Sequence, residues 1–241
     1  RRVIADVQLH LRGLQSVLAQ ADGFDPATLD MTVRLGMRDV LEAITLSPLM
    51  DVLAREAPRA QLASVRVPRE ALERSLSQGE VDLVIDRQRR VHGPIRSEHL
   101  ADERLSVLMR ADHPLARKRL SVAGYFEAQH VMVTLHPEQP DPLQAVWAAQ
   151  GLGERAVALR CQHYFAAAKV VAHSQALLTL PQTYAEQLTQ ALPLVVRELP
   201  VAVPPMSIWM YWHADRESDP MHRWLRQSVA GVARQAIRAA H

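Results

Sequence analysis

The chain has 241 residues, of which 48% are hydrophobic and 22% charged, with a formal net charge of +2. This length allows one large domain or two small ones, and the apolar content is sufficient for a buried core. The near balance of charge and the lack of a basic stripe argue against a nucleic-acid surface within this chain. A single cysteine excludes an internal disulfide framework and fits a reducing compartment. No apolar run approaches 18 residues, so we expect no membrane span.

The first 22 residues carry the spacing of a short coiled coil. Apolar residues recur at alternating intervals of three and four: Ile4, Val7, Leu11, Leu14 and Leu18. Two heptads are marginal as an isolated helix, so this helix requires a partner, either its own domain or a second copy of the chain. We therefore expect a linker or dimerisation helix over residues 1–22. The sequence begins inside this helix, and we expect a further part of the protein upstream.

A strand, a tight turn and a helix follow. Residues 31–37 alternate apolar and polar side chains, the period of a strand, and residues 40–53 switch to helical spacing. Arg38 and Asp39 lie between the two patterns, and Asp39 is a candidate N-cap. Such a turn directs free backbone N–H groups towards a position that suits an anion. The alternative is an ordinary strand–helix unit without a ligand.

The same alternation continues to the end of the chain. Further strands are predicted at 61–67, 81–85, 130–134, 156–161, 177–180, 195–199 and 207–213, with helices between most of them. The strand–helix order predicts parallel sheets with right-handed crossovers. Residues 95–110 read as a long extended segment with a break near Ala101 and Asp102. An amphipathic helix from Met221 ends the chain.

Several strings resemble the effector-binding domain of LysR-type transcriptional regulators. They are FDP and GMRD around the first strand, SQGEVDLVID at 77–86, DHPL at 112–115, ALLTLPQTYAEQL at 176–188, and WH, DP and WLRQ between 212 and 227. The resemblance covers nearly the whole chain. It implies an α/β fold with two Rossmann-like lobes joined by two crossover segments, the type II periplasmic-binding-protein-like arrangement, preceded by a linker helix. Lobe I would comprise 25–105 plus 207–241, and lobe II 106–206.

The resemblance also implies a function. The chain would be the effector-sensing and oligomerisation domain of a cytoplasmic homodimer or homotetramer, binding a small aromatic or carboxylate-bearing molecule between its lobes. DNA would be bound through a winged helix-turn-helix upstream of Arg1, and the similarity is greatest to regulators that respond to aromatic compounds. The main alternative is a solute-binding receptor of a transport system, which shares this fold but is normally exported.

No arrangement of residues predicts catalysis. The eleven histidines show no metal-binding spacing, so we expect no metal and no cofactor. Cys161 and His163, two residues apart, could pair as nucleophile and base, but no acidic residue or asparagine lies near them in sequence to orient the imidazole. We expect a buried, inert thiol and no enzymatic activity.

The candidate ligand-binding residues follow predicted strands, because ligands of open α/β sheets bind beyond the carboxyl ends of the strands. They are Arg38, Asp39, Thr134, His163, Tyr164 and Phe165. Asp86 is a further possibility, or it only caps the turn after its strand. Arg38 departs from the family, in which a small hydroxyl residue is common at this position. It could clamp a carboxylate, or pair with Asp39 and partly fill the cavity. A charged His163 would make binding pH-sensitive.

Overall fold

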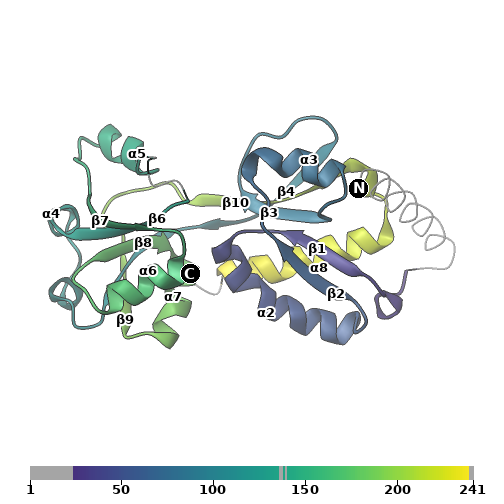
Figure 1. The fold of residues 1–241 in the computed structure, drawn as a ribbon, viewed down its shortest axis with the longest axis horizontal. Coiled ribbons are helices and arrows are strands. Elements are labelled where there is room, and N and C mark those ends of the chain that lie inside the picture. Colours follow the sequence, from purple (N-terminus) through teal and green to yellow (C-terminus); the bar gives the residue numbers. More distant parts are fainter. Residues whose placement is uncertain (1–23, 136–137, 139, 239–241) are drawn as a thin grey trace. The chain divides into compact units, whose positions relative to one another are not determined.

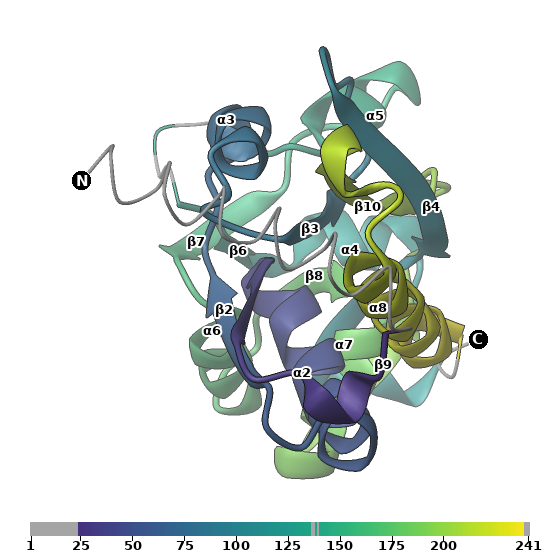
Figure 2. The ribbon, with the colours of Figure 1, turned by 90° about the vertical axis from the view of Figure 1, so that its right-hand side faces the viewer.

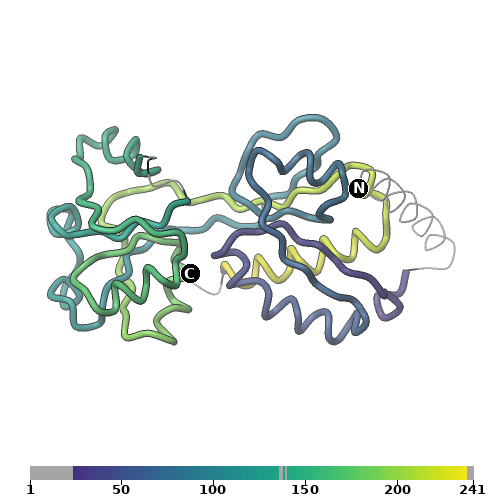
Figure 3. The backbone as a smooth tube through the Cα atoms, in the orientation of Figure 1, coloured from purple at the N-terminus to yellow at the C-terminus, as the bar shows by residue number. Residues whose placement is uncertain are grey.

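The computed structural model describes residues 24–135, 138 and 140–238. The predicted helix over 1–22 lies outside these residues. The described chain divides into two compact units: unit 1 comprises residues up to Asp102 and from Ser207 onward, and unit 2 comprises Glu103–Met206. The chain therefore passes from one unit to the other twice, once in each direction (Figure 3).

Unit 1 is built on a five-stranded mixed sheet with the strand order β2-β1-β3-β10-β4. Its strands are β1 (Thr32–Gly36), β2 (Gln61–Val65), β3 (Leu83–Arg87), β4 (Ile95–Glu103) and β10 (Met206–His213). β1 runs parallel to both β2 and β3, whereas β10 is antiparallel to β3. The returning segment is therefore inserted into a sheet that the sequence predicted as parallel.

The helices of unit 1 cover both faces of this sheet. They are α2 (Asp39–Glu56), α3 (Leu72–Ser77) and α8 (Pro220–Arg238), with the short helices η1 (Pro26–Thr28), η2 (Arg69–Ala71) and η4 (Ala214–Arg216). α2 and α8 lie together on one face and α3 lies on the other (Figure 1). Apolar side chains of α2 and α8 are buried because each helix has an apolar stripe that needs a partner.

Unit 2 repeats this architecture with the strand order β7-β6-β8-β5-β9. Its strands are β5 (Leu105–Arg110), β6 (Gln129–Val133), β7 (Ala156–Cys161), β8 (Leu177–Pro181) and β9 (Leu194–Glu198). Its helices are η3 (Pro114–Arg117), α4 (Val122–Glu127), α5 (Gln144–Ala149), α6 (Tyr164–Ala172) and α7 (Gln182–Ala191). β6 is parallel to β7 and β8, and β5 is antiparallel to β8 and β9.

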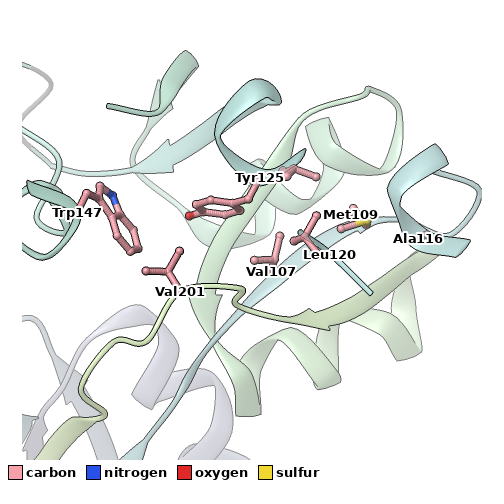
Figure 4. Packing of buried hydrophobic residues seen from close by; sticks show 8 residues of the cluster. Val107, Met109, Ala116, Leu120, Tyr125, Trp147 and Val201 are labelled. Atoms are coloured by element: carbon pink, nitrogen blue, oxygen red, sulfur yellow. The ribbon is translucent and has the colours of Figure 1, made fainter. Parts of the chain in front are cut away.

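One core of unit 2 is a cluster around two fully buried aromatic residues, Tyr125 and Trp147 (Figure 4). Their ring centroids are 6.1 Å apart in an edge-on arrangement. The Arg155 guanidinium contacts both residues: it stacks over the Trp147 ring at 5.8 Å, and Nη1 donates to Tyr125 Oη at 3.0 Å. Arg155 also pairs with the buried Asp141 carboxylate, with Nε 2.7 Å from Oδ2. Because a buried charge requires a partner, this ion pair holds the segment before α5 against the core.

Most predicted elements are present with ends shifted by one to three residues, and two element boundaries differ from the prediction. The break in the extended segment falls at Arg104, between β4 and β5, rather than near Ala101. The helix predicted between the strands at 61–67 and 81–85 starts with the 3₁₀ turn η2, which Pro68 caps. Within the described residues, no helix combines the length and the apolar character that a membrane crossing requires.

Candidate functional site

In unit 1, three side chains meet beyond the carboxyl ends of the parallel strands. Arg38 follows β1, Arg69 follows β2, and Asp86 lies near the end of β3. We call them the Arg–Asp cluster. Asp86 Oδ1 lies 3.7 Å from Arg38 Nε, and Oδ2 lies 3.4 Å from Arg69 Nε. The parallel arrangement of β2, β1 and β3 brings together residues that are up to 48 positions apart.

The carboxylate of Asp86 is the fixed member of this cluster. Its side chain is only 6% exposed, whereas those of Arg38 and Arg69 are 38% and 33% exposed. Asp86 also accepts a hydrogen bond from the backbone N–H of Arg87 at 2.8 Å. Arg69 is held further by the backbone oxygen of Gln88, 3.2 Å from its Nη2. A buried carboxylate therefore orients two guanidinium groups that reach solvent.

The Arg–Asp cluster has an excess of positive charge. Two guanidinium groups face one carboxylate, so one positive charge is uncompensated within the cluster. Arginine presents a planar fork of donors that matches a carboxylate in two-point contact. The cluster can therefore attract an anion and hold it at a defined position.

The Tyr211 hydroxyl fixes the backbone at the end of β3. It accepts from the N–H of Arg89 at 2.9 Å and donates to the oxygen of Arg87 at 3.4 Å. Burial raises the pKa of the Tyr211 phenol, and the neighbouring Asp86 carboxylate acts in the same direction. The phenol therefore stays protonated and retains the donor that fixes the backbone beside Asp86.

In unit 2, the predicted residues lie after two neighbouring parallel strands. Val133 of β6 pairs with Cys161 of β7, and Thr134 N–H continues the ladder by donating to the Cys161 oxygen at 2.8 Å. Thr134 and the residues after Cys161 therefore emerge at the same edge of the sheet. His163 is the N-cap residue of α6, and its oxygen accepts the helical bond from Ala167 at 3.0 Å.

Two aromatic rings follow His163 at the start of α6. Tyr164 packs edge-on against Tyr184 of α7, with ring centroids 6.2 Å apart. Phe165 is 49% exposed, an unusual degree of exposure for a large apolar side chain. The start of α6 thus presents a ring to solvent beside backbone N–H groups, a combination that suits a flat anion.

The thiol of Cys161 is half-buried, not fully buried as predicted. It contacts the backbone oxygen of His163 at 3.8 Å. Burial raises its pKa, so the thiolate fraction is small at neutral pH. The thiol therefore lacks the character of an activated nucleophile. Among the described residues, no group of three or more histidine, cysteine, aspartate or glutamate side chains could hold a metal ion.

The structure places the predicted residues in two sets, one in each unit. Arg38 and Asp39 are adjacent in unit 1. In unit 2, Thr134 lies at the sheet edge where the chain leaves β7 towards His163, Tyr164 and Phe165. The prediction that Asp39 is an N-cap is wrong. The N-cap is Arg38, which has an extended backbone and whose oxygen accepts from Glu42 N–H at 2.7 Å, so Asp39 is the first helical residue. At this position its negative charge interacts favourably with the helix dipole.

Sequence reasoning missed Arg69. The available signal was its position after Pro68, directly beyond a predicted strand parallel to the strand before Arg38. Asp86, considered only as a possibility, is the residue that joins the two arginines.

The two mixed five-stranded sheets, each with polar residues beyond its parallel strands, define a two-part α/β ligand-binding domain. Residues 27–234 match the family model of the LysR substrate binding domain. The chain belongs to this family: it is the effector-binding domain of a LysR-type transcriptional regulator, and the family consists of regulatory domains, not enzymes.

Known relatives agree with this assignment. The chain is similar to the HTH-type transcriptional activator NagR of a Ralstonia species, with 28% identity over 217 residues that cover 90% of this chain and 72% of NagR. Its fold is similar to the crystal structure of a probable transcriptional regulator from Pseudomonas aeruginosa, with a TM-score of 0.79 and 27% identity over 94% of this chain and 75% of that one. The BenM effector binding domain with its effector benzoate shares the fold, with a TM-score of 0.66 and 17% identity over 88% of this chain and 94% of that domain.

Proposed function

We propose that this domain senses a small aromatic or carboxylate-bearing effector. Unit 1 would contribute Arg38 and Asp39, joined by Arg69, and unit 2 would contribute Thr134, His163, Tyr164 and Phe165. Lobe I of the sensor would be 25–105 with 207–241, and lobe II would be 106–206. The proposal depends chiefly on the Arg–Asp cluster, in which a buried carboxylate fixes two guanidinium groups that reach solvent.

We infer an anionic effector from these two guanidinium groups. A carboxylate accepts charge-assisted hydrogen bonds from them, whereas a neutral ligand accepts only weaker ones. The exposed Phe165 ring favours a flat, unsaturated partner, because aromatic rings pack well edge-on or offset. BenM is described with benzoate as its effector, which is a ligand of this class.

The effector would act by shifting a conformational equilibrium. A ligand that binds one arrangement of the regulator more tightly by about 1–3 kcal/mol shifts the population by a useful factor. The response would reach DNA through a winged helix-turn-helix upstream of Arg1. The helix over 1–22 would assemble the regulator into a cytoplasmic homodimer or homotetramer.

Calorimetric titration with benzoate and with its uncharged amide, benzamide, tests the proposed site. We expect benzoate to bind and benzamide to bind at least about tenfold more weakly, because a charged hydrogen bond contributes about 1.5–3 kcal/mol. Arg38→Ala should weaken benzoate binding at least about tenfold for the same reason, and should affect benzamide little.

Arg74→Ala provides the matched control. Arg74 is exposed on α3, lies outside the Arg–Asp cluster, and forms no ion pair among the residues the structure describes. It should leave benzoate binding unchanged. If Arg38→Ala binds benzoate as the parent does, or if ring compounds bind equally well with and without a carboxylate, the proposed role of Arg38 is wrong.

A further inference from the structure

Unit 1 contains a polar cavity that shares no residue with the Arg–Asp cluster. It has a volume of about 650 Å³ and lies between β4, the end of β10 and the outer face of α8. Figure 2 shows β4, β10 and α8 on the same flank of unit 1. The residues that determine its charge are Arg96, Glu98, Glu217, Arg223, Arg226 and Arg234. We call this cavity the α8 groove.

Two of the four arginines are held in fixed positions. Arg226 is 8% exposed, stacks over the Trp212 ring at 4.8 Å, and donates to the oxygens of Arg216 and Glu217 at 3.0 and 3.1 Å. Arg234 Nη2 lies 2.6 Å from Glu98 Oε1 and 3.1 Å from the oxygen of His99. The groove therefore has a preformed floor of ordered guanidinium groups.

The other two arginines are available to a ligand. Arg96 on β4 and Arg223 on α8 are exposed, and neither forms an ion pair or a side-chain hydrogen bond with any residue in the described part of the chain. Four arginines against Glu98 and Glu217 leave a formal excess of two positive charges in the lining. Burial lowers the pKa of Arg226, and the nearby Arg223 acts in the same direction, in agreement with crowding of like charges.

Small residues on α8 leave space for a ligand along one side of the groove. Gly231 and Ala230 line it, and a Cβ added at Gly231 would meet no atom within 4 Å. Glycine in a helix interior costs about 1 kcal/mol relative to alanine. A larger side chain at this position would extend into the space between Arg223 and Arg234, which follow the same helix face.

We propose that the α8 groove binds a compact dianion, a phosphate monoester or a dicarboxylate, as a second ligand of this regulator. Arg96 and Arg223 would close on the ligand from β4 and α8, and Arg226 and Arg234 would form the positive floor. The excess of two charges matches the charge of the ligand. The volume falls within the range of about 300–1,000 Å³ that is usual for small-molecule sites.

The test is calorimetric titration of the whole chain carrying Arg38→Ala, which weakens the Arg–Asp cluster, with methyl phosphate and with succinate, at constant ionic strength, with chloride as the monovalent comparison. We expect one or both dianions to bind and chloride to show no saturable binding. The tighter of the two dianions identifies the ligand class. Arg223→Gln and Arg96→Gln should each weaken dianion binding at least tenfold, and Gly231→Met should weaken it by filling the groove.

Two controls separate this site from the effector site. Arg74→Gln removes an exposed positive charge elsewhere on unit 1 and should leave dianion binding unchanged. The Arg38→Ala background prevents dianion binding from being assigned to the Arg–Asp cluster, so the two proposals stand or fail independently. Absence of saturable binding for both dianions, or full binding in the Arg96→Gln, Arg223→Gln double variant, would overturn the proposal.

Discussion

At the end of β1 the backbone passes through a position that has no room for a side chain. A Cβ on Gly36 would lie 2.8 Å from a methyl group of Val67 and 2.8 Å from a methyl group of Val84. Both valines are buried and have short, branched side chains that cannot turn away. We expect Gly36→Ala to lower the free energy of unfolding by about 1–3 kcal/mol through overpacking. Urea denaturation monitored by circular dichroism measures this loss of stability.

Gly231→Ala is the matched control for that substitution. It makes the same chemical change at a helix position where a Cβ meets nothing within 4 Å. We expect it to stabilise the protein by up to about 1 kcal/mol, because alanine is the better helix former. Equal effects of the two substitutions would show that close packing at Gly36 is not the cause.

At this scale, sequence reasoning located side chains but not their partners. The strand period placed Arg38 at a carboxyl end, and the structure agrees. The ion pair between Arg38 and Asp86 joins residues 48 positions apart, and no local pattern specifies which of several acidic residues is nearest. The pairing depends on the sheet order, which a single sequence does not reveal.

Among the elements, α7 depends on a residue supplied by a distant strand. The Glu103 carboxylate, at the end of β4, accepts from Thr183 N–H at 3.0 Å and from Thr183 Oγ1 at 2.7 Å. Both residues are buried, so water cannot replace the carboxylate. We expect Glu103→Ala to cost about 1–3 kcal/mol of stability, because it leaves buried donors at the helix start unsatisfied. Thermal unfolding measures the loss.

Glu127→Ala is the control for the cap of α7. Glu127 is exposed at the end of α4 and forms no hydrogen bond or ion pair with the residues that the structure describes. Its removal should change stability by less than about 0.5 kcal/mol. A Glu103→Ala variant as stable as the Glu127→Ala variant would argue against the cap.

Element types were predictable and their junctions were not. Apolar periodicity identified β1, α2 and α8 because each must bury one face. The buried His222 and Arg226 on α8 were not predicted, since polar residues on a helix usually face solvent. The antiparallel entry of β10 was also unforeseen, because strand direction depends on where the returning chain fits into the sheet.

At the scale of the whole molecule, the family motifs were the main basis for predicting the fold and the family. They identified a LysR effector-binding domain with two α/β parts, and the family match over 27–234 confirms it. The α8 groove lies outside what those motifs could indicate. Its four arginines lie on two segments, β4 and α8, and only Arg226 falls within a motif string. The motif strings therefore specify the fold and not the charges that line one of its surfaces.

Each unit also contains one histidine that its neighbours hold neutral. In unit 2, His130 Nε2 donates to the oxygen of Tyr125 at 2.7 Å, and Nδ1 is buried without a partner among the described residues. In unit 1, His222 Nε2 donates to the oxygen of Asp82 at 2.9 Å, and Nδ1 accepts from Arg226 at 2.9 Å. A proton on Nδ1 of His130 would therefore lack an acceptor. A proton on Nδ1 of His222 would face the guanidinium group of Arg226.

We therefore expect acid to lower the free energy of unfolding of both units. Burial, the largest cause, lowers the pKa of His130 and of His222 to about 4, compared with about 6.5 in an unfolded chain. Between these values the unfolded chain binds more protons, so stability falls as pH falls from 6.5 towards 4, by up to about 3 kcal/mol for each histidine.

Urea denaturation at several pH values between 4 and 6.5 measures the slope of stability against pH. His130→Gln or His222→Gln should reduce it by up to about 1.4 kcal/mol per pH unit. The exposed His92→Gln should not, and an unchanged slope in the buried variants would assign the acid sensitivity to other groups.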